Sequence, residues 1–212
     1  MIVLNKVSKG DIKELSLYIS TGEMVCIYDH ERSKLRTLFN LLNRTEQVDQ
    51  GTIRFLDQGS YRTDPCNDLI GFVFNEDILI PGRNIIENLK YIMKIKNLDM
   101  SCWETRLRRI LEIVDLKNNY IQKTDQLMAH QVVRANIAQA ILNYPPIIIL
   151  EDPLSNLDQV NSQGIIHLLK RLNKFSMTVV LLSSDQHLIL GKEVRVLKIS
   201  NNFSEKKKGS YA

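Results

Sequence analysis

Apolar residues in the first third of the chain recur with the short periods of β-strands. Residues 2–4 and 15–19 alternate apolar and polar side chains, which is typical of half-buried antiparallel strands. Residues 24–28 form a short apolar run after a turn, and this run predicts a buried strand. Residues 51–56 and 70–74 predict two further strands. The chain therefore opens with a strand-rich segment.

Helical spacing of apolar residues appears at two places. The first is a helix directly after the strand at 24–28, and its apolar face consists of Leu35, Leu38, Phe39, Leu41 and Leu42. The second place begins at Ile85 and continues to about Asn143, where apolar residues recur at helical spacing through three successive segments. We therefore expect a block of three helices inserted after residue 75 or so.

Two apolar runs after this block are typical of central parallel strands. Pro145 and Pro146 end the helical pattern, and residues 147–150 and 178–183 are almost continuously apolar. Helical spacing separates the two runs, and an alternating segment at 194–199 predicts an edge strand.

The order of elements predicts a single α/β domain with a mixed sheet and an inserted helical subdomain. We expect the core at about 1–75 and 144–200, the helical insert at about 76–143, and a polar tail at 201–212.

Composition is ordinary for a globular protein, with 44% hydrophobic and 25% charged residues among 212. The net charge of +4 does not argue for nucleic acid, because basic and acidic residues are interspersed and Lys206 to Lys208 lie in the polar tail. Cys26, Cys66 and Cys102 have no metal-ligand spacing and fit a reducing compartment. The sequence has neither a signal peptide nor an apolar run that could span a membrane, so a membrane role requires a partner.

The chain has no glycine between Gly22 and Gly51, where the strand–helix pattern places a phosphate-binding loop. Such a loop follows the pattern G-x-x-x-x-G-K-[ST], in which glycines let backbone N–H groups surround the phosphates and the lysine reaches their oxygens. Counting back from the hydroxyl of Thr37 gives one possible register, and taking Lys34 as the lysine gives another. Neither register satisfies the pattern. In the first register, the two glycine positions hold Asp29 and Lys34, with Arg32 between these two. The lysine position holds Leu35, and the first hydroxyl position holds Arg36.

Several other short sequence segments occur along the chain in a characteristic order. They are Val7-Ser8-Lys9, Thr21-Gly22-Glu23-Met24, residues 70–75, residues 79–89, and Leu150-Glu151-Asp152-Pro153-Leu154-Ser155-Asn156-Leu157-Asp158. By these segments the chain resembles the ATPase subunits of ABC transporters over nearly its full length. It most resembles the FtsE-like cell-division group, whose members pair with a membrane protein of the FtsX type. The resemblance implies a P-loop NTPase-type mixed sheet with an antiparallel β-subdomain and a helical subdomain.

The resemblance also implies positions for the parts of an ATP site, which in this family lies between two subunits. Where the family has the small residues of its signature, this chain has Met128, Ala129 and His130. The Q-loop glutamine corresponds to Asn75, and the switch histidine corresponds to Ser184. His187, three residues later, is better interpreted as a surface histidine than as a relocated switch.

The Walker B carboxylates occur in swapped order, as Glu151 followed by Asp152. The shorter acid in the position of the catalytic base withdraws the carboxylate by roughly 1.3–1.5 Å, and a misplacement near 1 Å can cost about a hundredfold in rate. The two acids could still bind a cation, or they could be vestiges that cap the next loop.

The segment from Phe74 to Leu89 corresponds to the groove where a short cytoplasmic helix of the membrane subunit docks in this family. Its candidate partner-binding residues are Ile78, Leu79, Ile80 and Ile85. These apolar residues could equally close the core.

Our hypothesis from the sequence is a catalytically inactive scaffold subunit with weak or absent binding of ATP and Mg²⁺, and with no other cofactor or metal. We expect it on the inner face of the cell membrane, bound to an FtsX-like or permease-like protein, as a homodimer or as a heterodimer with another ABC ATPase-like chain. A working but atypical ATPase, with Lys34 or Arg36 replacing the loop lysine, is the alternative. A nucleic-acid-associated ATPase is disfavoured because the sequence has no basic stripe and no aromatic platform.

Overall fold

The computed structural model describes residues 1–57, 60–62, 69–185 and 191–199. The expectations for Cys66, His187 and the tail at 201–212 lie outside these residues.

The centre of the molecule is a five-stranded sheet in the order β6-β7-β8-β3-β9, in which all neighbouring strands are parallel. The strands are β3 (Met24–Tyr28), β6 (Ile70–Val73), β7 (Ile147–Glu151), β8 (Thr178–Ser183) and β9 (Arg195–Lys198). Every residue of β7 and β8 is buried, which confirms the interpretation of the two apolar runs as central strands. β9 lies at the edge of the sheet, as its alternating pattern predicted.

A second sheet is antiparallel between its paired strands and has the order β2-β1-β4-β5. Its strands are β1 (Ile2–Lys9), β2 (Ile12–Ile19), β4 (Gln50–Asp57) and β5 (Ser60–Arg62). The first two strands are longer than the alternating segments predicted. β5 was not predicted, because three residues are too few to show a period.

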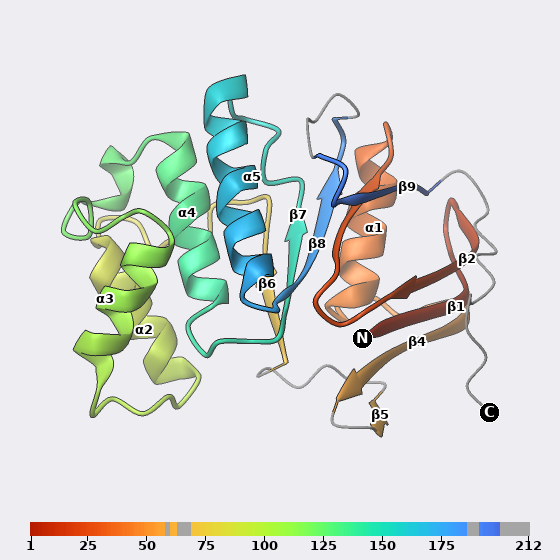
Figure 1. Ribbon diagram of the computed structural model, residues 1–212, viewed down its shortest axis with the longest axis horizontal. Coiled ribbons are helices and arrows are strands. Elements are labelled where there is room, and N and C mark those ends of the chain that lie inside the picture. Colours follow the sequence, from red (N-terminus) through yellow and green to blue (C-terminus); the bar gives the residue numbers. More distant parts are fainter. Residues whose placement is uncertain (58–59, 63–68, 186–190, 200–212) are drawn as a thin grey trace.

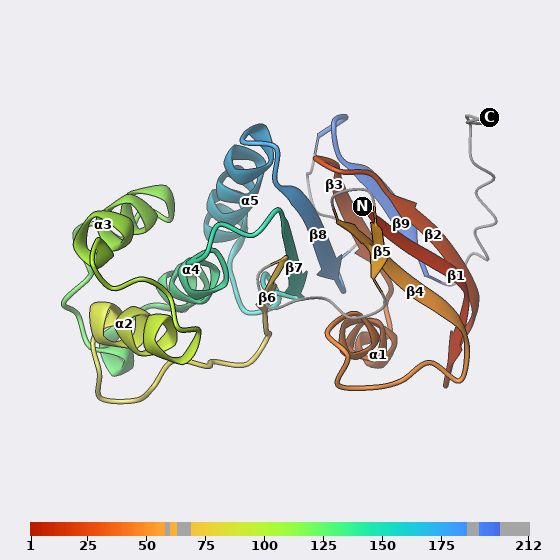
Figure 2. The ribbon, with the colours of Figure 1, turned by 90° about the horizontal axis from the view of Figure 1, so that it is seen from below.

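Six helical segments occur among the described residues. They are α1 (Arg32–Leu42), α2 (Ile85–Ile95), α3 (Trp103–Ile113), the 3₁₀ turn η1 (Thr124–Gln126), α4 (Ala129–Ala140) and α5 (Gln159–Lys174). Helix α1 packs into the same core cluster as the antiparallel sheet and one face of the parallel sheet, and all five of its predicted apolar residues are buried. Helices α2 and α3 lie at the opposite end of the molecule from the antiparallel sheet (Figure 2).

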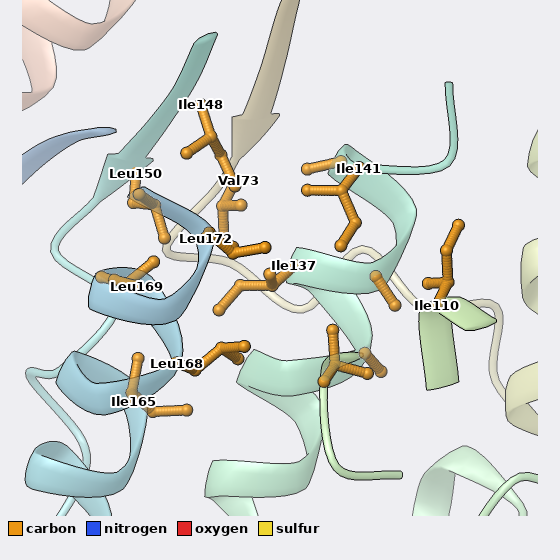
Figure 3. Packing of buried hydrophobic residues seen from close by; sticks show 14 of the residues in the cluster. Val73, Ile110, Ile137, Ile141, Ile148, Leu150, Ile165, Leu168, Leu169 and Leu172 are labelled. Atoms are coloured by element: carbon orange, nitrogen blue, oxygen red, sulfur yellow. The ribbon is translucent and has the colours of Figure 1, made fainter. Parts of the chain in front are cut away.

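The inserted helices share a hydrophobic core with the parallel sheet. Ile137 of α4 and Ile141, directly after its end, lie between Leu168 and Leu172 of α5 on one side and Ile110 of α3 on the other (Figure 3). All five side chains are at most 3% exposed. Helix α4 is therefore part of the main core, and it connects the outer helices α2 and α3 to the sheet.

Gly71 in β6 permits the close approach of α4. A Cβ atom at this position would lie 2.4 Å from the backbone oxygen of Ala140, which is closer than van der Waals contact allows. Because backbone atoms cannot yield cheaply, any side chain at position 71 would push the helix away from the sheet.

We expect Gly71→Ala to lower the free energy of unfolding by about 1–3 kcal/mol through this overlap. Gly164→Ala is the matched control, because Gly164 lies inside α5 and its Cβ would meet only a flexible arginine nitrogen at 3.3 Å. The control should gain up to about 1 kcal/mol from helix propensity. Urea unfolding followed by circular dichroism measures both, and equal stability of the two variants would contradict the packing argument.

Candidate functional site

The carboxyl ends of β3, β7 and β8 meet at one edge of the parallel sheet, at the top of Figure 1. Tyr28 at the end of β3 is in register with Ser183 of β8, and Glu151 at the end of β7 is in register with Leu182. Ligands of open α/β sheets bind at such an edge. The structure thus brings together the β3–α1 loop, the swapped acids and Ser184 as the candidate site.

The loop between β3 and α1 contains only Asp29, His30 and Glu31. Helix α1 begins at Arg32, and the carbonyl of Glu31 accepts the N–H groups of Lys34 at 3.0 Å and Leu35 at 3.5 Å. The helix therefore begins before the position of the second glycine, and it uses N–H groups that a phosphate loop would turn toward its ligand.

Asp29 places a carboxylate inside this loop. Its side chain is 3% exposed, and its Oδ1 accepts the backbone N–H of Glu31 at 3.0 Å. Its Oδ2 is buried without a hydrogen-bond partner. The residue that the sequence places at the first glycine position therefore has a buried acidic side chain.

Leu35, at the lysine position, lies in the core with 1% of its surface exposed. Because its side chain is apolar and packs inward, it offers no donor to a ligand at the sheet edge. Thr37, two residues later on α1, is half-buried.

The cations beside the loop are paired with acids of the same chain. Lys34 Nζ lies 2.7 Å from a carboxylate oxygen of Glu31, and this hydrogen bond raises the pKa of Lys34 above its usual value. Arg36 makes a 2.8 Å ion pair with Glu76, which raises the pKa of Arg36 in the same way.

The third cation, Arg32, joins Asp152 and Ser184 in a cluster that we call the clasp. Asp152 is 4% exposed, its Oδ1 accepts the N–H of Ser184 at 3.0 Å, and its Oδ2 accepts the Ser184 hydroxyl at 2.8 Å. The Nε of Arg32 lies 3.4 Å from the same Oδ2, and it donates to the Ser184 hydroxyl oxygen at 3.3 Å. The clasp links the start of α1 to the ends of β7 and β8.

Glu151 is directed toward Asn75 instead. One of its oxygens accepts the backbone N–H of Asn75 at 3.4 Å, and burial raises the pKa of the Glu151 carboxyl above its usual value. The Asn75 side chain accepts the Ser155 hydroxyl at 3.3 Å. In the part of the chain that the structure describes, no three His, Cys, Asp or Glu residues gather closely enough to hold a metal ion.

The positions of the family signature lie at the start of α4. Met128 is 66% exposed, and its backbone N–H donates to Gln131 Oε1 at 2.9 Å. Ala129 is exposed, and it lines a cavity of about 270 Å³ together with Asn75 and Leu157. His130 is half-buried and acts electrostatically on Asp158, whose pKa is lowered mainly by hydrogen bonds from Asn161. Ala129 and Asn75 therefore meet in this fold, whereas the β3–α1 loop does not line their cavity.

The predicted partner-binding segment divides into two kinds of residue. Ile78 is 40% exposed and Ile80 is half-buried. Leu79 and Ile85 are 5% and 0% exposed and pack into the core, so they offer no surface for docking. The buried Asn88 side chain fixes this arrangement, since its Oδ1 accepts the N–H of Ile80 at 2.7 Å.

Two features of the structure were not predicted. The clasp joins residues that are far apart in sequence, and no local pattern signals such a contact. The second feature is a cavity of about 540 Å³ on the helical subdomain, whose lining includes Ile86, Trp103, Leu107 and Tyr120. The apolar positions of α3 were visible in the sequence, but the packing that leaves a hollow between them was not.

A family model described as ABC transporter matches residues 12–155 of the chain. The chain belongs to this family, as the resemblance in the sequence implied.

The chain is 25% identical over 218 residues to the cell division ATP-binding protein FtsE of Streptococcus pneumoniae serotype 2, covering 99% of this chain and 95% of that protein. It is 32% identical over 183 residues to the macrolide export ATP-binding/permease protein MacB of Pasteurella multocida, but spans only 28% of that protein's length. The fold matches a dimeric structure of the ATP-binding cassette MJ0796 bound to ADP and Pi, with a TM-score of 0.75, 27% identity and coverage of 94% and 95% of the two chains.

We expect Asp152→Asn to lower the free energy of unfolding by about 1.5–3 kcal/mol, because it removes a buried charge that accepts two hydrogen bonds in the clasp. Asp49→Asn is the control, since its exposed ion pair with Lys9 should contribute less than about 1 kcal/mol. Denaturant unfolding measures both.

Double-mutant cycles with Asp152→Asn divide the lost free energy of unfolding between the contacts to Ser184 and to Arg32. Coupling to Ser184→Ala should exceed coupling to Arg32→Met, because the Arg32 side chain is 63% exposed and solvent screens its charge. If Asp152→Asn proved as stable as the control variant Asp49→Asn, the structural role of the clasp would be refuted.

Proposed function

We propose that this chain is a catalytically inactive member of the ABC transporter family that acts as a docking or scaffold subunit of a membrane complex. The observation that carries the proposal is the set of internal ion pairs at the sheet edge. Lys34, Arg36 and Arg32 each lie against a carboxylate of their own chain. Each of these cations therefore already has an acidic partner within the chain.

The residues of the β3–α1 loop fit a triphosphate poorly. Phosphate binding needs inward-facing N–H groups and a lysine, but this loop offers a buried carboxylate at Asp29 and a buried apolar side chain at Leu35. Like charges repel strongly where water is excluded, so Asp29 would oppose a phosphate at this position. Weak or absent binding of ATP and Mg²⁺ follows.

The swapped acids support the same proposal. Asp152 stands where the family has its catalytic base, yet both of its oxygens accept hydrogen bonds from Ser184. An acceptor held by two donors is poorly suited to take a proton from water. We interpret Asp152 as a structural residue, which develops the vestigial role considered from the sequence.

A membrane partner is part of the proposal. No helix among the described residues is long and apolar enough to cross a bilayer. One relative, the macrolide export ATP-binding/permease protein MacB, combines an ATP-binding part with a permease in its name. We propose that this chain lies on the inner face of the cell membrane and binds an FtsX-like or permease-like protein.

We propose that the partner's cytoplasmic helix lies along Ile78 and Ile80 and extends into the 540 Å³ cavity of the helical subdomain. The Ile86 N–H donates to the Tyr120 carbonyl at 3.2 Å, so the segment that follows Ile80 is continuous with one wall of the cavity. The cavity combines the aromatic rings of Trp103 and Tyr120 with the charged rim of Glu104 and Arg108. An amphipathic helix presents a matching apolar face with polar edges.

Dimerisation, as a homodimer or with another ABC ATPase-like chain, would then not depend on ATP. We propose that such a dimer rests on the segment from Ser155 to Asp158, on the C-terminal part of the chain or on the membrane partner.

The second candidate is a working but atypical ATPase of a transporter or cell-division complex. The exposed position of Arg36, whose side chain is 58% exposed beside the candidate site, favours this alternative. Arg36 would have to leave Glu76 to act on a phosphate.

Titration calorimetry with ATP and Mg²⁺ separates the two candidates. We expect no binding up to millimolar ATP, because the cations are paired and Asp29 repels phosphate. Micromolar binding that is lost in Lys34→Ala or Arg36→Ala, but kept in the remote variant Lys94→Ala, would establish the enzyme instead. Lys94 serves as the control because it lies in the last turn of α2, within the helical insert.

Co-expression with an FtsX-like or permease-like membrane protein, followed by co-purification, tests the docking surface. We expect Ile78→Asp to reduce recovery of the complex at least tenfold, because a buried charge opposes an apolar interface. Ile95→Asp is the matched control, since Ile95 is 58% exposed on the same subdomain and does not line the cavity. Equal recovery of both variants would count against this surface.

A further inference from the structure

A third cavity lies at the amino ends of β7 and β8, opposite the candidate site. The loops that precede these strands lie at the lower end of the sheet in Figure 1. Together with Arg109 and Ile113 of α3, Ile141 after the end of α4 and Leu172 of α5, they enclose about 390 Å³. This volume falls in the range of natural ligand pockets, about 300–1,000 Å³.

The lining of this hollow, which we call the basal cavity, is largely apolar. Ile141 and Leu172 are 1% and 3% exposed and form its buried floor. Tyr144 and Phe175 are 45% and 74% exposed and belong to the loops at its mouth. Two exposed rings over an apolar floor suit a ligand with an aromatic or branched aliphatic body.

Arg109 is the charged residue of this lining, and the lining includes no carboxylate. Its guanidinium lies 5.9 Å from the centre of the Tyr144 ring. Within the described residues, no acid stands within ion-pair distance of Arg109. The contrast with its neighbourhood is sharp, because Arg134 and Arg171 both pair with Asp115.

We propose that the basal cavity is a binding site for a small monocarboxylate with an apolar body. The body contacts Ile141, Leu172 and the two rings, and the carboxylate pairs with the Arg109 guanidinium. Arg109 is exposed, so water hydrates its guanidinium when no ligand is bound. Charge complementarity favours the anion, because only an anion adds an ion pair with Arg109.

A ligand in the basal cavity would contact both the helical subdomain and the loops that precede the central strands. Arg109 and Ile113 belong to α3, whereas the loops that carry Tyr144 and Phe175 lead into the central strands. A ligand that contacts both parts stabilises the arrangement of the outer helices against the sheet. The site lies at the opposite end of the strands from the clasp, so it does not depend on whether the chain binds nucleotide.

The test uses the full chain and three probes of the same shape: phenylbutyrate, phenylbutyramide and phenylbutylamine. Calorimetry and thermal unfolding should show that the carboxylate binds about tenfold more tightly than the amide, and that the amine binds most weakly. Arg109→Gln should remove the preference for the carboxylate and leave amide binding unchanged.

Arg108→Gln is the matched control, because Arg108 is the adjacent residue of α3 but lines the other cavity. It should keep the full preference for phenylbutyrate. Phe175→Ser should weaken all three probes, and its exposed position makes it safe for folding. The proposal is overturned if no probe binds, if the amine equals the carboxylate, or if Arg109→Gln binds phenylbutyrate as the unaltered chain does.

Discussion

The contact between the Asp152 carboxylate and Ser184 governs the chemistry of the sheet edge. A carboxylate that is 4% exposed must have donors, since an unpaired buried charge is strongly unfavourable. Ser184 supplies two donors at 3.0 and 2.8 Å, and Arg32 adds a positive charge. Because β7 and β8 are adjacent parallel strands, the backbone alone brings Asp152 and Ser184 close together. Residues of the same chain thus supply all the donors of the Asp152 carboxylate.

The need to pair the buried Asp152 carboxylate connects three residues that lie far apart in the sequence. An aspartate at position 152 is short enough to meet the residue after β8, and a serine at 184 offers both a hydroxyl and an N–H. Arg32 reaches the pair from the start of a helix that begins early. Arg32, Asp152 and Ser184 therefore form one consistent set of contacts. Such mutual consistency favours a maintained structure over random decay.

The fold was largely predictable, because continuous and alternating apolar runs define central and edge strands. The five apolar residues of α1 and the runs at β7 and β8 are buried as expected. The site was less predictable. Its positions followed from order along the chain, but Arg32 meeting Ser184 depends on strand order in space. Burial of Leu79 and Ile85 also depends on tertiary packing, because apolar residues near a surface can face either way.

The two ends of the parallel sheet differ in whether nearby cations form ion pairs. At the carboxyl end Arg32, Lys34 and Arg36 each have an acidic neighbour, so an incoming anion must displace an internal one. At the amino end Arg109 faces an apolar hollow that no acid lines. Displacing a pair that is already formed costs interaction free energy, whereas pairing with Arg109 costs mainly desolvation. Anion recognition by this chain is therefore better supported at the end of the sheet that the family comparison does not single out.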